Sequence, residues 1–440
     1  MNIIPFIDRA APLNNNSAVS TLGNERKGVV FDFLNMQAYI TNPDNPEHFY
    51  AGHPSGVLSY TAPSPKYVHN ASGKLESSVS LRCDHDPYTK EPLGALIEPQ
   101  STNLSTYSES FDNWTLTNAT FSNSSIPSPI SGVNYKRLDA LGGVTSNIRQ
   151  QLSGVGVAGG MTLSAYVKKG SGATHLGQFA IRDHTNSDTL IIYNFNFDNG
   201  SYTTIGGTQT ANSTLKAQRI SIDEWRVSVT CTAGISNGSQ MWIYVGNAGL
   251  TTPSAQHMYM TGVQFEPLPY STSYIKTEAS SVTRAADNIT MPLTRIPFNT
   301  QEGSVISEHL VRLYGVTPTY PAVWAFLGLG NNVIHLYNQT VSGAVRIFIN
   351  DNIGVLTDFG TGFFTTGDKV KVAVKFAEEE VATSVNNSTP VITSLIRALP
   401  DLTLLSIGRS SSTTLSSHVK SFVYLPRLLS NTELQEWSTL

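Results

Sequence analysis

Charged side chains are scarce in this sequence. Asp, Glu, Lys and Arg make up 14% of the 440 residues, whereas an average soluble domain has about 25%. This composition does not suit a helical enzyme rich in Glu and Lys. The net charge is −4 and the sequence has no basic stripe, so it does not indicate a nucleic-acid-binding protein.

Cysteine and long apolar runs are also lacking. The two cysteines, Cys83 and Cys231, lie far apart and match no metal-binding or redox spacing, so we expect two separate thiols rather than a disulfide. No stretch of about 18 apolar residues is present, and we expect no membrane span. The first residues show no charged segment followed by an apolar core. We therefore expect no signal peptide and synthesis in a cytoplasm.

Catalytic motifs are missing as well. A glycosidase needs two carboxylates that flank the scissile bond, and the Glu-x-Asp-x-x-Glu string of concanavalin-like glucanases does not occur. The acidic run 378–380 follows an expected strand and suits a solvated turn. No Gly-x-Ser-x-Gly, His-Glu-x-x-His or glycine-rich phosphate loop is present. The sequence therefore predicts no enzymatic activity and no cofactor.

One short acidic segment has two alternative interpretations. Asp84 and Asp86 flank His85, and carboxylates with an imidazole can bind a divalent ion. Three adjacent residues point in different directions, however, so a metal site needs ligands from elsewhere. Asp followed by Pro also favours a turn. The remaining histidines occur singly and are expected on the surface or as hydrogen-bonded core residues, among them His184, His257, His309 and His335.

Short alternating segments dominate the rest of the chain. Apolar residues alternate with other side chains over 161–167, 191–197, 225–231, 241–245 and 369–376. Alternation of period two is typical of strands with one buried face. Turn signals rich in Gly and Asn separate these segments and favour tight hairpins. Together with 18 Phe, 18 Tyr and 5 Trp, this pattern predicts an all-β protein built of β-sandwiches.

The pattern predicts an order of domains along the chain. The predicted segments are an N-terminal arm (1–28), a small β-rich adaptor (29–103), a jelly-roll domain (104–276), a linker (277–288) and a second sandwich (289–440). The arm has an apolar tip that can dock on another protein or simply fray. Ser430 and Glu433 form a capping box that predicts a single short helix over 431–438.

Surface aromatics are the remaining candidates for binding chemistry. Trp242 and Tyr244 share one face of an expected strand, and a flat aromatic ring can stack on the apolar face of a sugar. Asn247 and the polar segment 183–186 can supply hydrogen bonds. The alternative is that these rings cover a second sheet, which is the commoner role in a sandwich. In the last domain, the equivalent glycan-binding candidates are Trp324, Tyr337 and Arg346.

Three parts of the sequence resemble a widespread group of bacteriophage virion proteins. The first, 84–111, begins Asp84-His85-Asp86-Pro87 and continues through Leu96-Ile97-Glu98-Pro99-Gln100; the second combines 163–170 with 224–229; the third combines Val282-Thr283-Arg284-Ala285-Ala286-Asp287 with 422–435. The first stretch is similar to a signature found upstream of lectin-like domains in phage fibre proteins. In that stretch, Lys90 and Ala95 replace the usual Gly and Leu. The other two resemble a carbohydrate-binding-like jelly roll and a concanavalin- or laminin-G-like module.

The resemblance implies a protein on the virion surface, of the fibre or receptor-binding type, that binds host surface polysaccharide. It also implies attachment to other virion proteins through the arm and assembly into a homo-oligomer, expected to be a trimer. No nucleic acid and no membrane insertion are expected. An alternative is a capsid or tail decoration protein without a ligand of its own, favoured by the absence of a fibrous shaft. A polysaccharide depolymerase is a third possibility, but the missing carboxylate pair counts against it.

Overall fold

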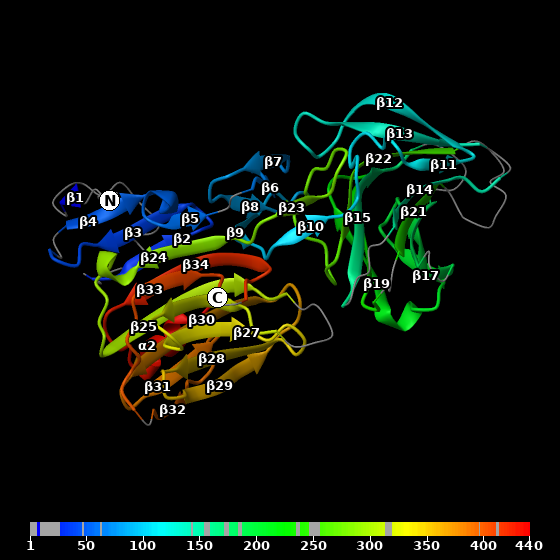
Figure 1. Ribbon diagram of the computed structural model, residues 1–440. Helices are drawn as coiled ribbons and strands as arrows, with labels where there is room; N and C mark the ends of the chain where they lie inside the picture. The colour runs from blue at the N-terminus through cyan, green and yellow to red at the C-terminus, as the bar shows by residue number, and fades with distance from the viewer. Residues whose placement is uncertain are drawn as a thin grey trace.

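The computed structural model describes residues 7–8, 27–45, 48–61, 64–141, 144–153, 159–170, 176–183, 187–234, 238–245, 256–312, 319–395, 397–410 and 413–440. The described chain is almost entirely antiparallel β structure and forms two sandwich lobes joined by a narrower region (Figure 1). This confirms the predicted all-β, tandem-sandwich architecture. Short 3-10 helices span Pro54–Gly56, Thr210–Asn212 and Leu293–Arg295. None of the described helices is long and apolar enough to cross a membrane.

The middle sandwich packs two sheets face to face, each with six strands among the described residues. The first sheet, in order of pairing, contains β11 (Thr115–Thr117), β14 (Asn147–Ser153), β21 (Gly238–Val245), β16 (Leu176–Asp183), β17 (Asp188–Asn196) and β18 (Tyr202–Gly206). The second contains β12 (Ala119–Pro127), β13 (Asn134–Ala140), β22 (Gln256–Glu266), β15 (Met161–Lys168), β20 (Glu224–Cys231) and β19 (Ser213–Arg219). Alternate residues such as Leu163, Phe195 and Val227 form the buried core between them.

The larger sandwich combines the strands after residue 287 with strands from the first hundred residues. Its first sheet, eleven strands in the described residues, contains β1 (Ile7–Asp8), β4 (His48–Gly52), β3 (Gln37–Thr41), β2 (Val29–Asp32), β34 (Ser417–Leu425), β25 (Glu302–Leu310), β30 (Lys369–Ala377), β31 (Val381–Val385) and β32 (Val391–Thr393), with β9 (Pro92–Ile97) beside β34 and β8 (Cys83–His85) beside β9. The second contains β29 (Val355–Phe363), β28 (Ala344–Asn350), β27 (Val333–Asn338), β26 (Ala322–Leu327), β33 (Leu404–Ile407), β24 (Asn288–Pro292) and β5 (Ser59–Thr61).

The segment predicted as a separate adaptor, 29–103, is not a domain of its own. β2 pairs with β34, β5 pairs with β24, and β9 pairs with β34. Val29, Phe31 and Ile97 lie in the same buried core as residues of the C-terminal strands. The predicted division between 29–103 and 289–440 is therefore corrected: both segments build one sandwich, and the middle sandwich is inserted between them (Figure 1).

Two thin connections join the sandwiches. β10 (Ser101–Asn103) pairs with β23 (Val282–Arg284), so the chain enters and leaves the middle sandwich side by side. Next to them lies a hairpin of β6 (Lys66–His69) and β7 (Leu75–Ser78). Leu75 of this hairpin packs with Tyr166 and Tyr274 in a small separate hydrophobic cluster. The joint thus has a core of its own rather than a bare linker.

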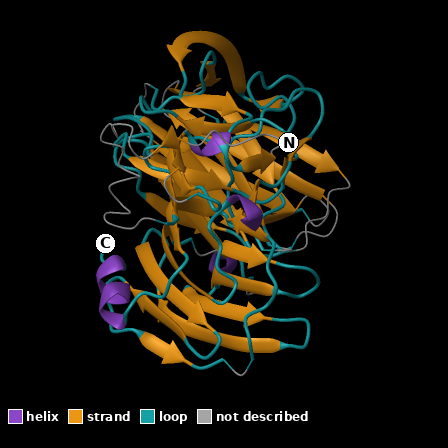
Figure 2. Cartoon of the chain, turned by 90° about the vertical axis from the view of Figure 1, so that its left-hand side faces the viewer, coloured by secondary structure: helices purple, strands orange, loops and turns teal. Residues whose placement is uncertain are grey.

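A single short α-helix near the C-terminus was predicted, and the described residues contain α2 (Asn431–Trp437), visible in Figure 2 beside the C-terminus. The capping box is formed in both directions, because Ser430 accepts from the backbone of Glu433 and Glu433 accepts from the backbone of Ser430. Leu434 is buried in a cluster with Ile306 and Val423. The helix therefore covers the outer face of the eleven-stranded sheet.

Only Ile7, Asp8 and residues 27–28 of the predicted N-terminal arm are among the described residues. Ile7 and Asp8 form β1, which pairs with Phe49 and His48 of β4 at the edge of the sheet. The role of the arm as a virion anchor stays a prediction.

Candidate functional site

The outward face of the seven-stranded sheet carries an unusual row of residues. Register pairs place Ala325 of β26 opposite His335 of β27, His335 opposite Phe348 of β28, and Phe348 opposite Asp358 of β29. The alternate residues of the same strands, such as Leu336 and Ile347, point into the core. Because directly paired residues share one face of a sheet, the row crosses four neighbouring strands on the side away from the core.

Aromatic rings gather along this row. The His335 ring lies 5.1 Å from the Phe348 ring and 5.3 Å from the Tyr337 ring, measured between centroids. Tyr320 contacts Tyr337 edge to face, with centroids 5.5 Å apart. Tyr320 is 47% exposed, so its ring is open to solvent. Ala325, which ends the row next to His335, is fully buried.

Asp358 accepts several hydrogen bonds at the site. Its Oδ1 accepts from the Tyr337 hydroxyl at 3.0 Å and from Nε of Arg346 at 2.9 Å. Arg346 also donates to the backbone oxygen of Asp358 at 3.0 Å. Burial, together with the charge of Asp358, raises the pKa of Tyr337 to about 12. The phenol therefore stays protonated and keeps donating to the carboxylate at neutral pH.

His335 is held neutral at the base of the site. Burial lowers its pKa to about 4, although the nearby charge of Asp358 acts in the opposite direction. Its Nδ1 is buried and has no hydrogen-bond partner among the described residues. A neutral imidazole with one unused nitrogen can accept or donate one hydrogen bond, depending on its tautomer.

Two adjoining hollows follow this face. One, of about 300 Å³, is lined by Tyr320, His335, Tyr337, Phe348 and Asp358. The other, of about 360 Å³, shares Tyr320, His335 and Phe348 with the first and extends to loop residues. Its further lining includes Asn331, Asn332, Asn350, Ser410 and Thr413. We call the two together the sheet-face groove. It combines aromatic surface with amide and hydroxyl groups along one side.

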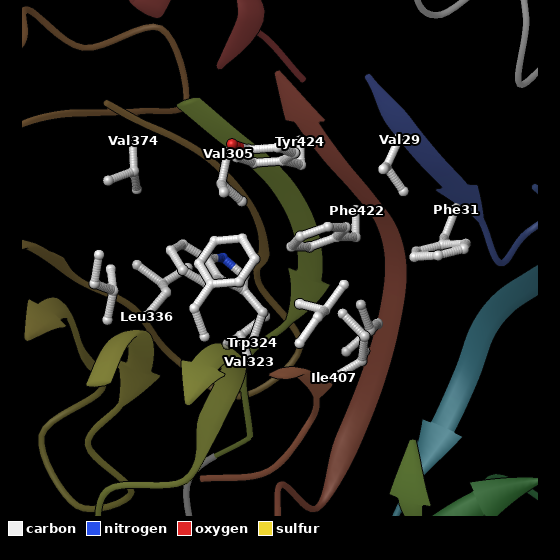
Figure 3. Packing of buried hydrophobic residues seen from close by; sticks show 14 of the residues in the cluster. Val29, Phe31, Val305, Val323, Trp324, Leu336, Val374, Ile407, Phe422 and Tyr424 are labelled. Carbon is white, nitrogen blue, oxygen red and sulfur yellow. The ribbon is translucent and has the colours of Figure 1, made fainter. Parts of the chain in front are cut away.

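Two of the predicted glycan-binding residues meet at this groove. Tyr337 lines it, and Arg346, its direct neighbour in register, holds Asp358. Trp324, the third candidate of the last domain, does not. It is fully buried in the core between the sheets, as Figure 3 shows, with Nε1 donating to Ser307 at 3.2 Å. A bulge between Ala322 and Trp324 shifts the register, and Val323 and Trp324 both enter the core. The surface role predicted for Trp324 is therefore wrong.

The candidates of the middle sandwich cannot be placed in the same way. The backbone of Trp242 and Tyr244 lies in β21, opposite Arg149 and Asn147 of β14. Their side chains, Asn247 and the polar residues 184–186 lie outside the described residues. Their proposed contact with a glycan stays a prediction.

The acidic segment after residue 83 is committed to protein contacts. Asp86 Oδ1 accepts from the backbone nitrogens of Tyr88 and Thr89 at 2.9 and 2.7 Å. Of the two alternatives, a metal site or a turn, Asp86 therefore forms the turn. Asp84 accepts from the backbone of His69 at 2.7 Å and lies 2.8 Å from Nε2 of His418. Among the described residues, no group of three or more His, Cys, Asp or Glu is arranged to hold a metal ion.

Three site residues were not predicted from the sequence, namely Tyr320, Phe348 and Asp358, and His335 was expected to be an isolated histidine. The alternation over 333–337 and 345–349 contained the signal for Phe348 and His335, because both stand between core positions. Asp358 had no such signal. Its strand is irregular, with register shifts at Ile349/Asn350 and Val345/Arg346.

Comparisons with known proteins find likeness at the level of structure only. No protein-family model matches the chain, and a search of curated proteins finds no match. The carbohydrate-binding module CBM40 of Ruminococcus gnavus IT-sialidase, bound to α2,3-sialyllactose, is 12% identical, with 32% of this chain and 84% of that chain covered and a TM-score of 0.28. Domain 4 of a GH43 extracellular arabinanase from Geobacillus stearothermophilus, in complex with arabinotriose, is 11% identical, with 39% and 82% covered and a TM-score of 0.29. Domains LG4-5 of the mouse laminin α1 chain are 10% identical, with 64% and 85% covered and a TM-score of 0.21. All three are similar to this chain in fold alone.

Proposed function

We propose that this protein is a non-enzymatic glycan-binding protein and that the sheet-face groove is its binding site. The observation that carries the proposal is the convergence of aromatic rings and a fixed carboxylate on one solvent-open sheet face. Tyr320 offers an exposed ring, and Asp358 is held in place by Tyr337 and Arg346. Sugar rings present apolar C–H faces and hydroxyl groups together, and this groove matches both.

The same geometry favours binding over hydrolysis. Glycoside hydrolysis needs two carboxyl groups, about 5–9.5 Å apart, on opposite sides of the scissile bond. Asp358 is the one carboxylate that lines the two described hollows. Its Oδ1 is already occupied by Tyr337 and Arg346. The groove therefore has an acceptor for sugar hydroxyls but lacks an acid–base pair.

The context of this binding is also a proposal, and it rests on the sequence. The stretch 84–111 resembles the segment that precedes lectin-like domains in phage fibre proteins. We place the protein on the virion surface, as a fibre or receptor-binding protein for a host surface polysaccharide. The arm 1–28 attaches it to other virion proteins, and the chain forms a homo-trimer. A light-scattering mass of one 47.6 kDa chain would argue against the trimer.

A glycan array probed with the labelled full-length chain tests the binding function. We expect saturable binding to at least one glycan. Tyr320→Ala removes the exposed ring and should weaken binding at least about fivefold, corresponding to about 1 kcal/mol. Tyr202→Ala is the matched control, because Tyr202 is similarly exposed at 46% but lies on β18 of the other sandwich. Its affinity should not change.

Three results would contradict the proposal. Equal binding by wild type and Tyr320→Ala would exclude the sheet-face groove as the site. No binding to any glycan or to intact host cells would favour the decoration protein, whose sandwiches only cover the particle. Release of reducing sugar from a bound polysaccharide would instead reveal a depolymerase.

A further inference from the structure

A second cavity lies where the two sandwiches meet. It has a volume of about 230 Å³ and is lined from both sides of the joint. Tyr166 of β15 and Arg226 of β20 come from the middle sandwich. His69 of β6, Arg312 and His418 of β34 come from the other side. We call it the joint cavity. It has no residue in common with the sheet-face groove.

Three residues of the cavity lining each have a polar atom that is buried without a hydrogen-bond partner among the described residues. These atoms are Nε2 of His69, the hydroxyl oxygen of Tyr166 and Nε of Arg226. His69 is 6% exposed and Tyr166 is fully buried. A buried polar group without a partner costs about 1–3 kcal/mol, so such groups are rare in folded proteins. Three around one cavity point to a ligand that satisfies them.

The two arginines of the cavity converge on one segment of chain. Arg226 donates to the backbone oxygen of Thr272 at 2.5 Å, and Arg312 donates to the backbone oxygen of Ser271 at 2.8 Å. These acceptors belong to consecutive residues, and both arginines line the same cavity. Neither arginine forms an ion pair with a carboxylate in the part of the chain that the structure describes.

The acidic residues on the cavity lining do not balance these charges. Asp84 is buried, which by itself would raise its pKa, but hydrogen bonds from His418 and His69 hold the pKa well below its usual range. Its charge is therefore shared with two imidazoles. Glu98 accepts from the backbone and hydroxyl of Ser273 at 2.7 and 2.6 Å and lies 3.5 Å from Arg284. Both carboxylates are thus already engaged.

A further cation increases the positive charge near the cavity. Lys216 lies on β19, opposite Ser228 of β20. Burial, and then the charge of Arg312, lower the pKa of Lys216. Arg226 and Ser228 are two residues apart and share the same face of β20, so Lys216 is beside the arginine pair. Lys216, Arg226 and Arg312 therefore form a group of three cations on this side of the joint, and the buried carboxylate of Glu266 binds the backbone nitrogen and hydroxyl of Thr272 nearby.

We propose that the joint cavity binds an anionic group between Arg226 and Arg312, with Nε2 of His69 and the Tyr166 hydroxyl as further donors. The chemistry fits a carboxylate, phosphate or sulfate, because guanidinium groups donate to planar or tetrahedral oxyanions in pairs. Nδ1 of His69 faces Oδ1 of Asp84, 3.4 Å away, so Nε2 is the ring nitrogen left for the anion. The volume is below the about 300–1,000 Å³ of drug-sized ligand sites. It suits a small anion or a single acidic sugar.

Calorimetric titration of the full-length chain tests the proposal. The probes are inorganic phosphate and glucuronate, with glucose as the uncharged counterpart of glucuronate, at constant ionic strength. We expect phosphate, glucuronate or both to bind saturably with one site per chain, and glucose not to bind in the joint cavity. Tighter binding of glucuronate would identify an acidic saccharide as the source of the anion, and tighter binding of phosphate would identify a free inorganic anion.

Variants connect the binding to the cavity. Arg226→Gln and Arg312→Gln should each weaken anion binding at least about tenfold, since a charge-assisted hydrogen bond is lost. Arg82→Gln is the control, because Arg82 is a half-exposed arginine in a loose 3.7 Å pair with Glu76 and should bind as wild type does. If Arg226→Gln does not fold, Arg312→Gln alone tests the proposal. Absence of saturable binding of both anions would overturn the proposal. So would an anion affinity equal to that of wild type in both arginine variants. Tyr320→Ala leaves this site intact, so failure of glycan binding and failure of anion binding are separate outcomes.

Discussion

Nζ of Lys66 lies 2.7 Å from Oδ2 of Asp287, and both side chains are almost completely withdrawn from solvent. The same carboxylate accepts from the Tyr60 hydroxyl at 2.7 Å and from the backbone of Glu98 at 2.9 Å. Glu98 in turn contacts Arg284. The pair therefore ties the two stretches that resemble phage proteins, around Glu98 and around Asp287, into one buried network. In this protein both stretches help to build the joint between the sandwiches, and Glu98 also lines the joint cavity.

Replacement of Asp287 by Asn should destabilise the protein strongly. The change leaves the buried ammonium of Lys66 without its counter-charge, and breaking one half of a buried ion pair costs about 3–5 kcal/mol. The free energy of unfolding from urea denaturation measures the loss. Glu76→Gln removes one member of the exposed Glu76–Arg82 pair and should cost no more than about 0.5 kcal/mol. Similar losses in both variants would show that the Lys66 pair contributes nothing beyond a surface contact.

Stability should fall as the pH drops from 6.5 to 5. Burial lowers the pKa of both His309 and His335 to about 4, below the value near 6.5 in an unfolded chain. The unfolded state therefore takes up protons first, and the stability present above pH 6.5 is lost as the pH falls towards 4. Each histidine contributes a loss of about 1–2 kcal/mol by pH 5.

His309→Leu separates this effect from other titrations. Its free energy of unfolding should change less between pH 6.5 and 5 than that of wild type, whatever its absolute value. The pKa values of Asp84 and Glu98 are lowered in the folded state, against the opposing effect of burial. Their contribution is therefore lost only below about pH 4.5. If the free energy of unfolding of His309→Leu fell with pH as steeply as that of wild type, His309 would already be protonated in the folded protein.

Trp324→Ala should reduce stability without acting through the sheet-face groove. The ring is fully buried between the sheets of the larger sandwich, and truncation of such a residue costs about 3–5 kcal/mol. Thermal unfolding gives the loss. Glycan affinity, measured at a temperature where the variant is folded, should stay within about twofold of wild type, because the ring lies in the core and not in the groove. A twofold change corresponds to less than about 0.5 kcal/mol. A large loss of glycan affinity in the fully folded variant would mean that Trp324 belongs to the binding site.

Ser430→Ala should weaken the attachment of α2. The substitution removes the acceptor for the backbone nitrogen of Glu433, and loss of an N-cap costs about 1 kcal/mol. Ser430→Asp keeps an acceptor and is the matched control, with stability close to wild type. The midpoint of urea unfolding distinguishes the two. Equal stability of the Ala and Asp variants would mean that the cap does not hold the helix.

Local patterns predicted the local elements of this fold. The alternating rows 161–167 and 225–231 are β15 and β20, and the capping box begins α2 as expected. The pairing of β2 with β34 had no such signal, because it joins residues from the two ends of the chain. The pattern of each short strand in 29–103 fits a small separate domain as well as it fits the larger sandwich. Which sheet a strand joins depends on non-local partners that the sequence alone does not identify.

The candidate site was predicted in part, for a similar reason. Tyr337 and Arg346 stand at outward positions of regular strands, so period-two alternation was sufficient to select them. Trp324 follows a bulge, and a shift of one residue moves a side chain to the opposite face. Asp358 reaches the groove only through the irregular register of β29. Regular alternation thus gave the correct candidates and also contained the signal for the missed His335 and Phe348, whereas bulges account for the false Trp324 and the missed Asp358.

The inserted position of the middle sandwich has a consequence for biosynthesis. A ribosome makes β2 long before β34, with which it pairs, because the whole middle sandwich lies between them in sequence. The middle sandwich is contiguous in sequence and can fold as soon as it emerges. The early strands meanwhile keep unpaired edges, which are prone to wrong pairing. The edge of β2 therefore stays open until β34 has been made, and a chain released before β34 would leave the larger sandwich open.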